Sequence, residues 1–75
     1  MKEIVEIIAR ALVDHPESVV VEEKDEDRMT VFELHVAQED MGKVIGKQGR
    51  IAKAIRTVVK AASVHSEKPV FVEII

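Results

Sequence analysis

The chain has 75 residues, a formal net charge of −3 and no cysteine. This length allows one domain with a small hydrophobic core and leaves no room for a separate substrate domain. The lack of cysteine excludes disulfide bonds and thiolate metal sites, and no apolar run is long enough to cross a bilayer. We therefore expect a single domain over residues 1–75 that acts in the cytoplasm and has no membrane partner.

Residues 4–13 predict an amphipathic helix. Apolar residues recur there every three or four positions, charged residues occupy the opposite side, and His15-Pro16 ends the pattern. The apolar side comprises Ile4, Ile8, Ala11 and Leu12. This side is expected to face the core.

A β-hairpin is expected to follow this helix. Residues 18–22 are short and β-branched, residues 25–27 form an acidic turn, and residues 30–36 alternate between apolar and polar. Phe32 falls on the inner face of its strand and is expected to belong to the core. With two phenylalanines and no tyrosine or tryptophan, the chain lacks the aromatic surface on which RRM and OB-fold domains stack bases.

The second half predicts two helices around a loop, and then a third strand. Glu39 or Asp40 can cap a short helix that ends before the loop at residues 46–49. An amphipathic helix then runs from residue 50 to about residue 64, and after Lys68-Pro69 the last strand covers residues 70–75. The predicted order is α-β-β-α-α-β.

Positive charge is concentrated in residues 41–66. This segment holds six of the eleven lysines and arginines and none of the fourteen acidic residues. Its long helix has a basic side with Lys53, Arg56 and Lys60, opposite an apolar side that comprises Ile51, Ile55, Val58 and Ala62. The charge of each of these three residues, taken singly, can be explained by solubility. Solvated helices, however, usually mix both signs of charge. The segment as a whole therefore predicts a binding surface for a polyanion.

The sequence Gly46-Lys47-Gln48-Gly49 lies at the centre of this segment. Gly46 follows a helical turn, where a residue with positive φ often ends the helix, and Gly49 lets a nucleic-acid backbone approach closely. Free N–H groups at the start of the next helix add partial positive charge to Lys47 and Arg50. The loop therefore predicts a phosphate site, although its spacing matches neither a P-loop nor a dinucleotide fingerprint.

The string VIGKQGRIAKAI, placed between two helices, resembles the signature of KH domains. The element order resembles the type II KH fold, and the length and layout resemble the small bacterial single-KH proteins of the KhpA family. This resemblance covers the whole chain and implies an α+β fold with a three-stranded mixed sheet and helices on one face. It also implies binding of single-stranded RNA beside the GxxG loop, a role as post-transcriptional regulator or RNA chaperone, and pairing as a homodimer or with the related protein KhpB.

The resemblance also assigns roles to individual residues. Residues 46–49 would hold phosphates, while Val44, Ile45 and Ile51 would form an apolar floor beneath the bases. The full set of predicted RNA-binding residues is Lys43, Val44, Ile45, Gly46, Lys47, Gln48, Gly49, Arg50, Ile51 and Lys53. The acidic turn at residues 25–27 corresponds to the variable loop of the family and would influence the RNA strand if it borders the groove.

No enzyme activity, cofactor or metal site is predicted. The chain offers no catalytic triad, its three histidines are far apart in sequence, and the acidic residues 22–27 lack the ligand order of a calcium loop. The alternative to an RNA-binding protein is a KH-shaped subunit whose main role is protein assembly. Apolar residues expected on the outer face of the sheet favour a dimer, although strands in parallel pairing are often apolar on both sides. These outer residues are Val20, Val31, Phe71 and Ile75.

Overall fold

The computed structural model describes residues 1–75 and contains three α-helices and three β-strands, connected in part by short 3₁₀ turns. The elements are α1 (Lys2–Leu12), β1 (Val20–Asp25), β2 (Thr30–His35), α2 (Met41–Ile45), α3 (Arg50–Ala62) and β3 (Val70–Ile74). This order confirms the predicted α-β-β-α-α-β pattern and the α+β class. None of the helices has the length and apolar character needed to cross a bilayer.

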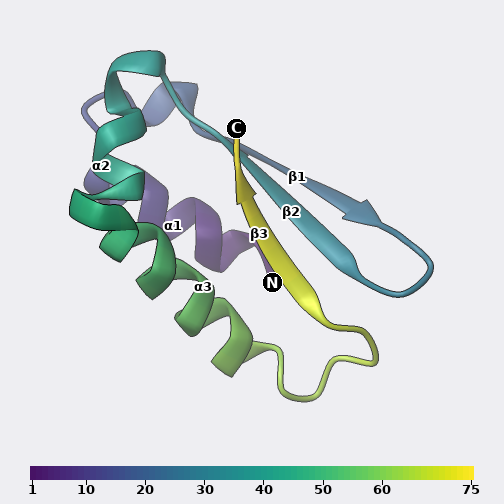
Figure 1. Cartoon of the computed structure of the whole chain (residues 1–75). Coiled ribbons are helices and arrows are strands. Elements are labelled where there is room, and N and C mark those ends of the chain that lie inside the picture. The colour runs from purple at the N-terminus through teal and green to yellow at the C-terminus, as the bar shows by residue number, and fades with distance from the viewer.

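The three strands form one mixed sheet in the order β1-β2-β3. β1 pairs with β2 in antiparallel register, and β2 pairs with β3 in parallel register. The helices cover one face of this sheet and leave the other face open (Figure 1). This is the arrangement implied by the type II KH resemblance.

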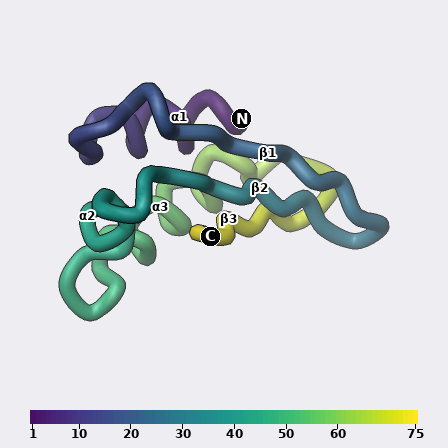
Figure 2. Tube along the Cα trace, turned by 90° about the horizontal axis from the view of Figure 1, so that it is seen from above, coloured from purple at the N-terminus to yellow at the C-terminus, as the bar shows by residue number.

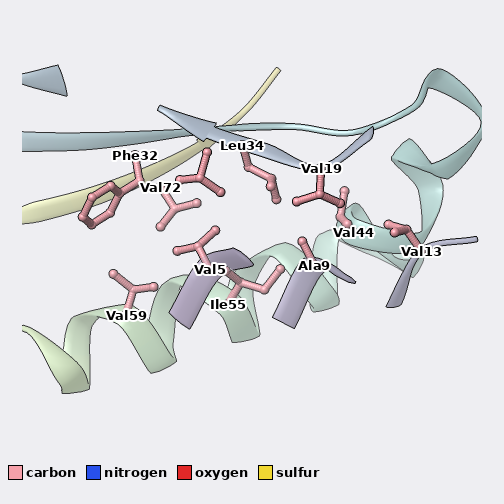
Figure 3. Packing of buried hydrophobic residues seen from close by; sticks show 11 residues of the cluster. Val5, Ala9, Val13, Val19, Phe32, Leu34, Val44, Ile55, Val59 and Val72 are labelled. Atoms are coloured by element: carbon pink, nitrogen blue, oxygen red, sulfur yellow. The ribbon is translucent and has the colours of Figure 1, made fainter. Parts of the chain in front are cut away.

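The core lies between the sheet and the two longer helices. Phe32, Leu34 and Val72 point from the strands toward Val5 and Ile55 on the helices (Figure 3). Phe32 is almost completely buried, as predicted, because it stands on the inner face of the central strand. The remaining core residues are Ala9, Val13, Val19, Val21, Val44 and Val59.

The amphipathic helix α1 is confirmed, but its buried side differs in part from the predicted apolar side. The structure buries Val5 and Ala9, whereas Ala11 is exposed and Leu12 is 37% exposed. Ile8 packs against the edge of the core, and together with Leu12 it lines an apolar groove of about 300 Å³ between α1 and α3. Apolar residues cover two adjacent sides of this helix, and only the position of the sheet decides which of them enters the core.

The same correction applies to α3. Its core side consists of Ala52, Ile55 and Val59, while Val58 and Ala62 are exposed and Ile51 is half-buried. Spacings of three and four residues allow both sets to form a continuous stripe through Ile55. The prediction chose the stripe that faces the groove beside α1, because both stripes have equivalent periodicity in the sequence.

Candidate nucleic-acid interface

The chain reverses sharply between α2 and α3, where residues 46–49 form the GxxG loop. α2 ends at Ile45 and is followed by its C-cap Gly46, which has φ 77° and ψ 174°, and Gly49 has φ 74° and ψ 14°. Gln48 also has a positive φ of 59°. The Gly49 N–H donates to the Gly46 carbonyl at 3.1 Å and closes the turn. Three residues with positive φ therefore turn the chain within one short loop.

The two glycines are needed for different reasons. A Cβ on Gly46 would lie 2.3 Å from Cγ1 of Ile51, whereas a Cβ on Gly49 would meet no atom within 4 Å. Gly46 thus allows close packing of the loop on α3. Gly49 provides the left-handed backbone and leaves open space in front of the loop, where a phosphate group can approach.

The start of α3 provides donors and positive charge beside this open space. Gly49 occupies the N-cap position and offers no side-chain cap, and the N–H of Arg50, the first residue of the 13-residue helix, already donates to the Lys47 carbonyl. No acidic residue lies in the first turn. Lys47, Gln48 and Arg50 are exposed, and Arg50 Nη2 donates to Gln48 Oε1 at 3.4 Å. The arrangement favours an anion.

The six cations of residues 41–66 differ in their freedom to bind a ligand. Lys47, Arg50, Lys53 and Lys60 form no ion pair within the chain. Arg56 Nε donates to the Val72 carbonyl at 3.2 Å and so attaches α3 to the edge strand β3. The sixth cation, on α2, is already paired with acidic residues. The loop and the exposed side of α3 therefore carry the unpaired positive charge.

This sixth cation, Lys43, is one of the predicted RNA-binding residues, and in the structure two carboxylates hold it. Its Nζ contacts Asp14 Oδ2 and lies 3.6 Å from Asp40 Oδ1. The hydrogen bond to Asp14 raises the pKa of the Lys43 ammonium, and Asp40 adds to this effect. The sequence did not indicate this pairing, because Asp14 is distant in sequence and becomes a neighbour of α2 only in the folded chain.

Asp40 is buried and connects the end of α1 to the start of α2. Its Oδ1 and Oδ2 accept hydrogen bonds from the backbone N–H groups of Asp14 and His15 at 3.1 and 3.0 Å. Burial acts to raise the pKa of Asp40, but these two N–H groups and the nearby charges outweigh it, and the pKa lies below its ordinary value. Asp40 does not make the predicted side-chain cap of α2, because its oxygens are already bound by the segment after α1.

The three apolar residues predicted to lie beneath the bases occupy different environments. Val44 is 0% exposed and belongs to the core, so it cannot contact a ligand in this structure. Ile45 is 37% exposed, and Ile51 is half-buried beside Gly46. The prediction for Val44 was therefore wrong, since it points toward the sheet.

The sequence did not indicate a hollow between α3 and β3. This hollow of about 180 Å³ is lined by Arg56, Lys60, Val70, Phe71 and Val72. The basic periodicity of α3 was visible in the sequence, but its contact with β3 depends on the fold. The acidic hairpin tip lies at the opposite end of the molecule from the GxxG loop (Figures 1 and 2), so it does not border this loop.

A cluster on the open face of the sheet also escaped the sequence prediction. The register pairs Glu22 with Glu33, and His35 Nε2 lies 4.0 and 3.9 Å from their carboxylate oxygens. Their candidate ligand atoms all lie within 4.8 Å of one another. Lys24 Nζ is 3.1 Å from Glu33 and partly neutralises the cluster. Sequence spacing did not reveal this group because its members belong to two strands.

Comparisons with known proteins agree with the fold. The sequence model of the family described as KhpA/KhpB, KH domain matches residues 2–74. A relative named RNA-binding protein KhpA from Clostridium perfringens is 65% identical over 75 residues, and one of the same name from Clostridium acetobutylicum is 61% identical, with complete coverage of both chains. The protein of this name from Listeria monocytogenes is 51% identical and covers 100% of this chain and 99% of its own.

Two solved structures of Era are similar to the chain. Era from Aquifex aeolicus bound to GDP·AlF4⁻ matches with a TM-score of 0.68 and 25% identity, over 96% of this chain and 28% of Era. Era in complex with MgGDPNP and nucleotides 1506–1542 of 16S ribosomal RNA matches with a TM-score of 0.54 and 25% identity, over 97% of this chain and 30% of that one. The chain thus spans less than a third of Era.

The family match and the curated relatives cover the chain from one end to the other. The relatives bear the name of a binding protein, and the family is not enzymatic, which confirms the prediction on enzyme activity. The chain belongs to the KhpA/KhpB family of KH-domain proteins.

Proposed function

We propose that this protein binds single-stranded RNA through the GxxG loop and the basic side of α3. The observation that carries the proposal is the group of unpaired cations at the open start of a helix, namely Lys47, Arg50 and Lys53, with Lys60 further along. Relatives that are 51–65% identical over the whole chain carry the name RNA-binding protein. These two lines of support are independent of each other.

In this proposal the loop holds the RNA backbone and the neighbouring apolar surface accepts the bases. Lys47, the Gln48 amide and the N–H groups that follow Arg50 at the start of α3 would bind consecutive phosphates, which positions the strand without reading its sequence. A KH loop of this kind clamps about four nucleotides. Ile45 and Ile51 provide apolar surface beside the loop, and the lack of aromatic platforms favours short contacts of modest affinity.

A double substitution in the loop tests this proposal. Lys47→Asp with Gln48→Asp places two negative charges where the phosphates would lie, and aspartate is one of the residues that tolerate the positive φ of Gln48. We expect at least about a tenfold loss of affinity for a short single-stranded RNA at low salt, measured by fluorescence anisotropy. Circular dichroism should show an unchanged fold.

The matched control is Lys2→Asp with Ser66→Asp. It makes the same change of net charge at two exposed positions outside the loop and α3. We expect this control to retain most of the RNA affinity. Equal affinities of the loop variant and the unmodified protein would show that RNA does not bind at the GxxG loop.

We extend the proposal to the cellular role. A protein that clamps short unpaired RNA with modest affinity can act in the cytoplasm as a post-transcriptional regulator or RNA chaperone. A strand-annealing assay with the same two double variants tests the chaperone activity. If the loop variant still accelerates strand annealing, the chaperone activity does not depend on the GxxG loop.

The open face of the sheet supports a second proposal, pairing with a second copy of the chain or with KhpB. Val20 and Ile75 are 49% and 51% exposed there, and Phe71 is similarly exposed. A chain of this size gains stability when a partner covers such residues. The name of the matching family includes both KhpA and KhpB, which supports the choice of partner.

A further inference from the structure

We infer that Asp14 is an affinity-determining residue, which limits RNA binding by occupying Lys43 with a carboxylate where a phosphate would otherwise bind. This inference rests on the proposed function of the GxxG loop. It concerns a contact between the segment after α1 and the helix that leads into this loop. Neither the family match nor the names of the relatives assigns a role to this contact.

Lys43 is placed to add a phosphate contact to the loop. It precedes Gly46 by three residues on α2, a rise of about 4.5 Å along the helix axis. Its side chain is 42% exposed, and four flexible bonds allow the ammonium group to move toward a ligand. In the structure this ammonium group contacts Asp14 instead.

Asp14 makes no other contact that requires the charge of its carboxylate. Its side chain is 72% exposed and bonds only to Lys43. It also lies just beyond the C-terminal end of α1, where a negative charge is unfavourable for the helix. The backbone N–H of Asp14 binds Asp40, and this bond does not depend on the Asp14 carboxylate.

Asp40 does not need Lys43 to satisfy its carboxylate oxygens. Both of its oxygens already accept backbone N–H groups at 3.1 and 3.0 Å, and Lys43 Nζ is 3.6 Å away. Removal of the Asp14 charge therefore leaves Asp40 paired and releases most of the restraint on Lys43. A carboxylate and a phosphate compete for the same ammonium donor, because both accept charge-assisted hydrogen bonds.

Asp14→Asn tests the inference. The substitution keeps the size of the side chain and the backbone bond to Asp40, and removes the charge. We expect RNA affinity at low salt to rise by about three- to tenfold, and the slope of log affinity against log salt to steepen by about 0.7, which corresponds to one added phosphate contact. Asp27→Asn is the matched control, since it removes an exposed charge at the hairpin tip and should change affinity much less.

Lys43→Ala completes a double-mutant cycle. In the unmodified protein it should change affinity less than about twofold, because Lys43 is occupied, whereas in the Asp14→Asn background it should abolish the whole gain. The inference is overturned if Asp14→Asn changes neither affinity nor slope beyond the Asp27→Asn control. It is also overturned if Lys43→Ala alone weakens binding as much as Lys47→Ala.

The loop variant Lys47→Asp/Gln48→Asp distinguishes a failure of the proposed function from a failure of the inference on Asp14. If this variant loses RNA binding and Asp14→Asn gives no gain, the proposed function stands and the inference on Asp14 is wrong. If RNA binding survives in the loop variant, both are wrong. Thermal denaturation of every variant verifies that the differences do not come from unfolding.

Discussion

At the scale of single residues, Gly46 and Gly49 have similar φ angles and different environments. Gly46 has a backbone conformation that is essentially restricted to glycine, and Ile51 fills the space a Cβ would need. Gly49 has a left-handed helical conformation with free space around it. The GxxG motif therefore combines one position fixed by packing with one position kept open for a ligand.

Two alanine substitutions distinguish these roles. Gly46→Ala should lower the free energy of unfolding by about 3 kcal/mol or more, because backbone strain and overpacking add. Gly49→Ala should cost only about 1–2 kcal/mol, the penalty for a left-handed residue with a Cβ. Urea denaturation measures both values. Equal losses would mean that the loop relaxes around Gly46 and that its contact with Ile51 does not restrict the position.

At the scale of elements, α3 presents three sides with separate tasks. Ala52, Ile55 and Val59 face the sheet, while Val58 lines the groove beside α1. The third side carries the cations, of which Arg56 is fixed to β3. Because the sides are distinct, substitutions of the basic residues should change ligand binding without affecting the core.

RNA affinity should be graded along α3. Lys47→Ala should weaken binding more than Lys53→Ala, and Lys60→Ala should have the smallest effect, because Lys60 lies nearly three turns beyond the loop and acts mainly through its long-range field. Each lost phosphate contact should reduce the salt slope by about 0.7. A salt titration by fluorescence anisotropy measures this order. A larger effect of Lys60→Ala would place the strand in the hollow beside β3 rather than at the loop.

At the scale of the whole molecule, the helices cover only one face of the sheet. The open face combines apolar side chains with Glu22, Glu33 and Glu73, which the register aligns across the three strands. Aligned like charges are unfavourable in a sheet. A partner on this face thus gains apolar contacts near Val20 and Ile75 and has to accommodate the acidic row.

Sedimentation velocity at micromolar concentration tests pairing through this face. The unmodified chain should sediment as a dimer that dissociates on dilution, and Val20→Asp or Ile75→Asp should give a monomer. Ile7→Asp, at an exposed apolar position on α1, is the matched control and should leave the dimer intact. A clean monomer in the unmodified chain would leave KhpB as the remaining partner. A further variant, Val58→Asp, alters an exposed residue of α3, and loss of the dimer in this variant alone would place the contact on the helices.

The sequence by itself determined the features that depend on neighbouring residues. The order of the elements, the alternation around Phe32, the turn at Gly46 and the absence of acids from residues 41–66 all follow from local spacing and composition. The GxxG loop and its flanking helices could therefore be predicted within two residues of their observed ends, with the family resemblance supplying the type II KH fold.

Only the tertiary structure decided which sides of α1 and α3 enter the core and which cations remain free. Two stripes on each helix satisfy the helical period, and the sheet selects one of them. Lys43 is paired because the fold brings Asp14 next to α2, and Val44 is excluded from ligand contact because it packs beneath the sheet. These properties depend on contacts between segments far apart in the chain, for which local periodicity carries no information.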